Sequence, residues 1–113
     1  MADNRVMVVE CDQYKRKLVK ERLKKGLEPW GGMSNFVSPG DQVLLKVNLL
    51  MGKTPQEAVT THPVIVQVVA DLVAEAGGKP IIGDSPGGPF NKPMLNRVYS
   101  KTGMDTAADT TEA

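Results

Sequence analysis

The chain has 113 residues, of which 41% are hydrophobic and 24% charged, with a formal net charge of +1. This length fits one small domain, and the composition excludes a wholly disordered chain. The near-neutral charge gives no reason to expect a strongly charged partner, and neither a nucleic-acid nor a membrane partner is predicted. The single cysteine, Cys11, excludes an internal disulfide, and a cytoplasmic location is expected.

The first half of the chain predicts two strands with a helix between them. The segment RVMVVE at residues 5–10 is short, Val-rich and bounded by polar residues, which indicates a buried strand. Apolar residues at helical spacing then predict a helix at 14–28, which ends in a segment rich in proline and glycine. After the turn SPGD at 38–41, the segment QVLLKV predicts a second strand at 42–47.

The second half predicts two further helices around a third strand. Apolar residues at helical spacing predict a helix at 63–77, with a threonine before it as its cap and two glycines after it. The segment KPIIGDS predicts a strand at 80–83, and PMLNRVYSKTG predicts a helix at 93–102. The small, polar residues 104–113 predict a frayed tail.

The predicted order is therefore β-α-β-α-β-α, which indicates a three-layer type of α/β domain over residues 1–103 with a parallel sheet. In a parallel sheet the carboxyl ends of all strands lie at one edge. Three loops would meet there, beginning at Cys11, at Asn48 and at Asp84. Open α/β sheets bind ligands outside this edge, so a binding site is expected there.

Lys46 and Asn48 stand two residues apart near the end of the second strand, so their side chains lie on the same face. An ammonium and an amide in this position could hold an anionic oxygen. The simpler interpretation is that Lys46 extends past apolar surface while Asn48 makes the turn. The two residues alone favour that simpler interpretation.

The segment GDSPGG at residues 83–88 suggests a second part of the site. The glycines, including Gly87 and Gly88, would let backbone N–H groups approach a ligand, and Ser85 adds a hydroxyl. Asp84 could bind a metal or a ligand hydroxyl. Equally, the segment could be a strand exit in which Asp84 caps its own turn, and the sequence leaves both readings open.

Thr61 and His62 precede the helix at 63–77. The positive end of a helix dipole favours the neutral imidazole, which could serve as a hydrogen-bond partner, although His62 could equally be a plain helix-start residue. A nucleophilic pair of Cys11 with His62 ranks lower, and no metal-ligand spacing is present. The basic run KRKLVKERLKK at 15–25 is more typical of a solvated helix face than of a phosphate or membrane contact.

Several segments taken together resemble one known family. They are VECDQY, FVSPGDQVLLKVNLL, AVTTHPVIVQVVADLVAEAGG, IIGDSPGG and LNRVYSKTGM. In this order they resemble the domain-of-unknown-function family number 362, and the most specific series is KxNLL, TTHP and GDSPG. The family usually has a proline where this chain has Val47, which leaves Lys46 and Asn48 in place.

The resemblance implies that the chain is the N-terminal part of a longer protein, often one with a ferredoxin-type iron–sulfur segment. A 4Fe–4S cluster would then belong to the full-length protein, since this part has no cluster-binding cysteines. The expected function is binding of a small anionic molecule or cofactor at the sheet edge. The alternatives are half of an enzyme site completed by a missing C-terminal portion, and a module that docks a partner. Self-association through open sheet edges is also expected.

Overall fold

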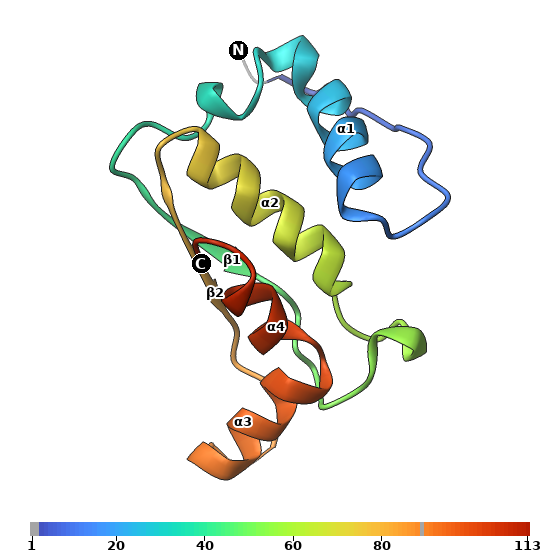
Figure 1. Ribbon diagram of the computed structural model, residues 1–113, viewed down its shortest axis with the longest axis vertical. Helices are drawn as coiled ribbons and strands as arrows, with labels where there is room; N and C mark the ends of the chain where they lie inside the picture. The colour runs from blue at the N-terminus through green and yellow to red at the C-terminus, as the bar shows by residue number, and fades with distance from the viewer. Residues whose placement is uncertain (1–2, 89) are drawn as a thin grey trace.

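The computed structural model describes residues 3–88 and 90–113 (Figure 1). In chain order its elements are α1 (Arg16–Leu27), the 3₁₀ helices η1 (Glu28–Trp30) and η2 (Met33–Asn35), β1 (Gln42–Lys46), η3 (Pro55–Glu57), α2 (Pro63–Glu75), β2 (Lys79–Gly83), α3 (Lys92–Lys101) and α4 (Met104–Asp109). The central element is α2, which packs against both strands, α1 and α4. The α/β class predicted from the sequence is confirmed at this level.

The sheet consists of β1 and β2, which run parallel and are joined by α2. The strands predicted at 42–47 and 80–83 are therefore present, and they end level with each other because Lys46 pairs with Gly83. The helices predicted at 14–28, 63–77 and 93–102 correspond to α1, α2 and α3. Caps account for two of the helix starts, since His62 and Asn91 each accept a hydrogen bond from a first-turn N–H.

The strand predicted at residues 5–10 is wrong, because this segment is extended but pairs with no strand. Val6 and Val8 are 85% and 87% exposed. Met7 and Val9 instead approach Gly26 of α1, within 3.7 Å of the position that a Cβ would take there. Alternation places only half of the valine-rich segment against the helix, so its apolar composition reflects packing on α1 and not burial in a sheet.

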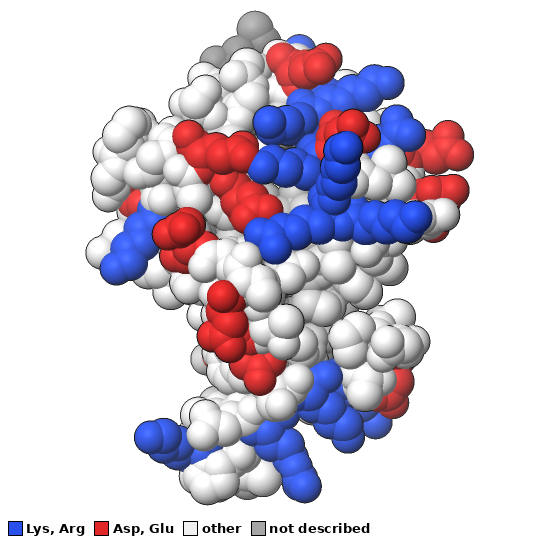
Figure 2. Space-filling view, viewed as in Figure 1, with Lys and Arg blue, Asp and Glu red and all other residues white. Residues whose placement is uncertain are grey.

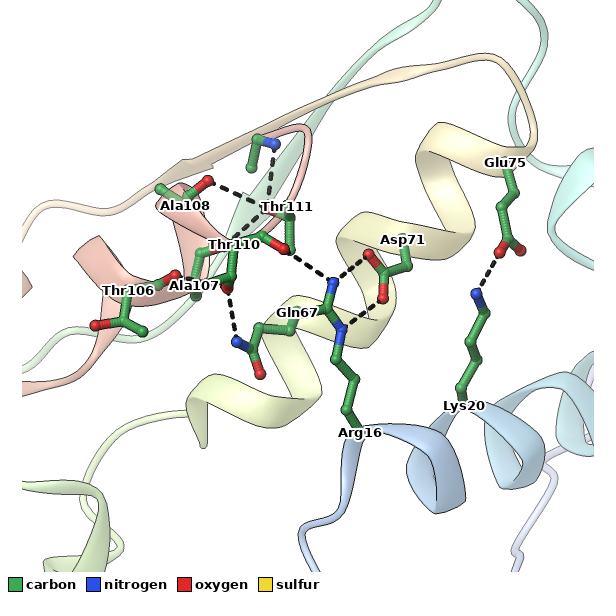
Figure 3. A network of polar contacts seen from close by, with 11 residues as sticks. Arg16, Lys20, Gln67, Asp71, Glu75, Thr106, Ala107, Ala108, Thr110 and Thr111 are labelled. Carbon is green, nitrogen blue, oxygen red and sulfur yellow. Dashed lines mark hydrogen bonds and ion pairs between the residues drawn. The ribbon is translucent and has the colours of Figure 1, made fainter.

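The basic residues of the N-terminal helix pair partly with α2. Figure 2 shows basic side chains gathered over the part of the molecule that carries α1, with acidic side chains among them. Arg16 donates two hydrogen bonds to Asp71, at 2.9 and 2.7 Å. Lys20 forms an ion pair with Glu75 (Figure 3). These pairs fasten α1 to α2, so two residues of the basic run, which was interpreted as a solvated helix face, lie at a contact between helices.

The prediction of a frayed tail at 104–113 is also wrong. Met104 and Ala107 of α4 are fully buried, and α4 packs on α2. The carbonyl oxygen of Thr110 accepts a hydrogen bond of 3.0 Å from Arg16, and the Thr110 hydroxyl accepts one of 2.8 Å from Gln67 (Figure 3). The small residues of this segment therefore allow a short helix to pack closely, and Thr110 bonds it to α1 and α2.

Two groups of buried residues make up the core. One lies between α1 and α2 and contains Val19, Val68 and Leu72. The other lies beneath the carboxyl end of β1, between α2, α3 and α4, and contains Val47, Leu49, Val66, Val98, Met104 and Ala107. The second group supports the loops that leave the sheet, so the candidate site rests on the larger of the two groups of buried residues.

The three-layer arrangement is not confirmed. In the part of the chain that the structure describes, α2 covers one face of the sheet, while Leu44 and Ile81 on the strands are 64% and 40% exposed. These two residues are register partners, so they form a small apolar area on the sheet. The self-association expected from the sequence stays a prediction.

Candidate functional site

The two strands bring Lys46, Asn48 and Asp84 together at the carboxyl edge of the sheet. Lys46 is the last residue of β1, and Asp84 directly follows the last residue of β2. The Lys46 Nζ donates a hydrogen bond of 2.7 Å to the Asn48 Oδ1 and lies 3.5 Å from the Asp84 Oδ1. The convergence expected from parallel topology is thus present for these three side chains.

Asp84 holds the two strand exits in place. Its Oδ2 accepts a hydrogen bond of 2.5 Å from the Leu49 N–H, and its side chain is only 10% exposed. Hydrogen bonds from the backbone N–H groups of Ser85 and then Leu49 lower the pKa of Asp84, and Lys46 acts in the same direction, while burial opposes them. The carboxylate is therefore ionised at neutral pH and links the loop after β1 to the loop after β2.

The contact with Lys46 also fixes how the Asn48 amide is turned. Since Oδ1 accepts from the ammonium, the Nδ2 group is directed elsewhere, and it donates no hydrogen bond within the described residues. The Asn48 backbone is left-handed, with φ at 51°, a conformation that asparagine tolerates better than most residues. The Lys46 side chain is 65% exposed. Together they present an ammonium and an amide N–H group side by side.

The GDSPGG loop lies alongside the loop that follows β1. Gly87 donates its N–H to the carbonyl of Leu50 at 3.0 Å. This N–H is therefore not available to a ligand, contrary to the expectation from the sequence. An added Cβ at Gly87 would lie 3.2 Å from the same oxygen, which explains the close approach of the two loops. Ser85 and Gly88 are exposed, and Gly88 adopts a φ of 99° that favours glycine.

Thr61 and His62 lie in a separate hollow. The Nδ1 atom of His62 accepts a hydrogen bond of 3.2 Å from the Val64 N–H, which leaves the proton on Nε2. The ring stacks on Tyr14, with 3.6 Å between centroids, and burial lowers the pKa of His62. The imidazole is therefore neutral at physiological pH, as the sequence analysis expected, but burial is the cause found here.

This hollow has a volume of about 500 Å³ and is lined by Tyr14, Pro55, Gln56, Ala58, Thr60, Thr61 and His62. Lys46 and Asn48 do not line it. The Thr61 N–H donates to the Val47 carbonyl at 3.4 Å, which joins the hollow to the end of β1 through the backbone. The structure thus divides the predicted site residues into two sets. One is the strand-edge group, formed by Lys46, Asn48, Asp84 and the GDSPGG loop, and the other is the pair Thr61 and His62 at the start of α2.

The stack of Tyr14 on His62 was missed by sequence reasoning. The helix predicted at 14–28 would include Tyr14, but Tyr14 precedes α1 and lies against the start of α2. No local pattern signals such a contact, because the two residues are far apart in sequence. Cys11 donates to the Gln13 carbonyl at 3.4 Å and forms no hydrogen bond with His62, so the structure does not bring the suggested nucleophilic pair into contact.

The described residues hold neither a cluster of metal-ligating side chains nor a helix fit to cross a membrane. Within residues 3–88 and 90–113, no three His, Cys, Asp or Glu side chains are grouped as a metal site would require. Among the helices of these same residues, none combines the length and the apolar character that crossing a bilayer demands.

The fold and the site define a small α/β domain with interacting polar loops at the carboxyl edge of a parallel sheet. The family model of a domain of unknown function, DUF362, matches residues 43–113, and the chain belongs to this family. The resemblance drawn from the sequence is confirmed. The matched part begins at the second residue of β1 and contains the rest of that strand, α2, β2, α3 and α4, and thus all of the strand-edge group.

One relative is the Thylakoid-associated protein sll1697 of Synechocystis sp.. It is 51% identical over 81 residues, which are 72% of this chain and 25% of that protein. The chain thus spans about a quarter of the length of that relative. No solved structure matches the chain. Since the name of the relative refers to thylakoids, the cytoplasmic location expected from the sequence stays a prediction.

Proposed function

We propose that the carboxyl edge of the β1–β2 sheet binds an anionic small molecule, with Lys46 as its charged contact. The observation that carries the proposal is the 2.7 Å hydrogen bond between Lys46 and Asn48. It holds an ammonium and an outward amide N–H group next to each other at the edge where open α/β sheets bind ligands. Paired donors of this kind suit a phosphate or carboxylate oxygen, and the ammonium makes the hydrogen bond charge-assisted.

Asp84 serves as a positioning residue in this proposal. A bare carboxylate would repel an anion, but two backbone N–H groups and Lys46 surround this one and offset its charge. Its side chain is mostly buried, whereas that of Lys46 is mostly exposed. The ligand therefore approaches from the solvent side of Lys46, while Asp84 keeps the two loops at the correct spacing. Ser85 and Gly88, which are exposed beside them, would border the bound molecule.

The residues of this chain do not fit a 4Fe–4S cluster. Such clusters are held by four cysteine thiolates, and the sequence contains one cysteine. The iron–sulfur association implied by the family resemblance is therefore a proposal about segments of longer family members. Completion of an enzyme site by such segments is the alternative function, and it would use the same Lys46 and Asn48 donors.

The test is titration calorimetry of the chain with inorganic phosphate, AMP and citrate. Lys46→Ala should weaken binding about ten- to hundredfold, because it removes one charge-assisted hydrogen bond. Lys79→Ala is the matched control, since Lys79 is the first residue of β2 and lies at the amino-terminal end of the strands, away from Lys46. Its removal changes the net charge equally and should leave the affinity unchanged.

Equal affinities of the two variants would contradict the proposal, because they would assign the effect to net charge alone. Failure of the wild-type chain to bind any of the three probes would also contradict it. Thermal melts of both variants show whether the fold is intact, and Lys46 is exposed enough for its truncation to leave the core unchanged.

A further inference from the structure

A second basic region lies on α3, in a part of the molecule that the sequence analysis did not associate with a site. Arg97 and Lys101 stand four residues apart on this helix, so their side chains lie on the same face. Neither forms an ion pair within the described residues. Figure 2 shows basic side chains at the lower end of the molecule, where Figure 1 places α3.

These two cations border a groove. It has a volume of about 680 Å³ and is lined by Gly52, Met94, Arg97, Val98, Ser100 and Lys101. The loop after β1 forms one side, because a Cβ built at Gly52 would lie 3.7 Å from the Val98 Cα and 3.9 Å from the Lys101 Cδ. The hydroxyl of Ser100 and the N–H of Gly52 donate no hydrogen bond within the described residues. The groove thus combines two positive charges with two further donors.

We infer that this groove is an anion subsite that takes a phosphate-bearing small molecule. Like charges four residues apart on a helix disfavour each other, and a bound anion between them would relieve that repulsion. A phosphate offers several acceptor oxygens, which matches a guanidinium, an ammonium, a hydroxyl and a backbone N–H. The volume of the groove is that of a small-molecule site.

The acidic group to be weighed against this inference is Glu57. Its pKa is lowered mainly by hydrogen bonds from the Thr54 backbone and hydroxyl, with smaller effects from the charges of Lys53 and Lys101. Its carboxylate is therefore already bonded within η3 and lies 3.7 Å from Lys53. Glu57 does not line the groove, so Arg97 and Lys101 keep their charges available to a ligand.

The subsite does not depend on the proposed function at Lys46, because different residues form it. The test is titration of the isotope-labelled chain with inorganic phosphate and with pyrophosphate, followed by the backbone amide signals of Gly52 and Ser100 in NMR spectra. Arg97→Gln and Lys101→Gln should each raise the dissociation constant roughly tenfold or more. Pyrophosphate should bind more tightly than phosphate, since its two charged groups can meet both cations.

Lys92→Gln is the matched control, because Lys92 lies on the same helix but does not line the groove. It should change the dissociation constant less than twofold, an expectation that follows from screening of exposed charges. An effect of Lys92→Gln equal to that of Lys101→Gln would overturn the inference, because the general charge of α3 would then explain the binding. Shifts that never saturate, or that miss Gly52 and Ser100, would overturn it as well.

Discussion

Met104 provides a direct test of whether the C-terminal segment belongs to the folded domain. Its side chain is 0% exposed at the start of α4, in the group of buried residues that includes Val47, Leu49, Val66 and Val98. Met104→Ala removes three heavy atoms from this group and leaves a cavity. Substitutions of this kind in well-packed cores cost about 2–5 kcal/mol of the free energy of unfolding. Small domains have about 5–15 kcal/mol in total, so the effect should be large.

The assay is urea unfolding of the wild-type chain and the variant, followed by circular dichroism. Met94→Ala is the control, since Met94 also lies on a helix but is 39% exposed, and it should cost less than about 1 kcal/mol. A similar small cost for both variants would refute the reasoning, because it would show that α4 is not packed in solution. A change in the slope of unfolding with urea would point instead to loss of a separate, weakly attached segment.

Two further predictions concern the backbone and pH. Gly78→Ala should destabilise the chain by about 1–3 kcal/mol in the same assay, because a Cβ there would lie 2.6 Å from Val37 and 3.0 Å from Val73; an unchanged midpoint would show that the turn can shift freely. The pKa of Asp84 is lowered from its ordinary value of 3.8, so the stability it contributes is present above that pH and is lost as the pH falls through the lowered pKa. Asp84→Asn should therefore have a lower melting temperature than wild type at pH 7, with the difference shrinking below about pH 3.8, and a constant difference at all pH values would argue against this role.

The alternation of strands and helices in the second half of the chain was predictable because those elements have strong, separate signals. The apolar run before Lys46, the helical pattern after His62 and the glycines at the helix end all favour one arrangement. Residues 5–10 carry a strand-like composition, but their partner is α1. The pattern of alternate valines is the same in either case, so composition alone could not distinguish them.

The site was predictable to the extent that topology determines it. Parallel strands that end level must bring Lys46, Asn48 and Asp84 to one edge, and they do. The hydrogen bond of Asp84 to Leu49 depends on positions within a fraction of an ångström, which no sequence pattern encodes. The same holds for the stack of Tyr14 on His62, because it joins segments that lie on different elements.

The side-chain amide of Asn48 offers the most direct test of the anion site. The account requires that Lys46 holds Oδ1 and that Nδ2 remains a donor for the ligand. In NMR spectra of the labelled chain, the two Nδ2 protons should shift on addition of inorganic phosphate and saturate at the affinity measured by calorimetry. Lys46→Ala should abolish this shift, whereas Lys79→Ala should leave it unchanged. An Asn48 side-chain signal that stays fixed while phosphate binds elsewhere would contradict the proposed site.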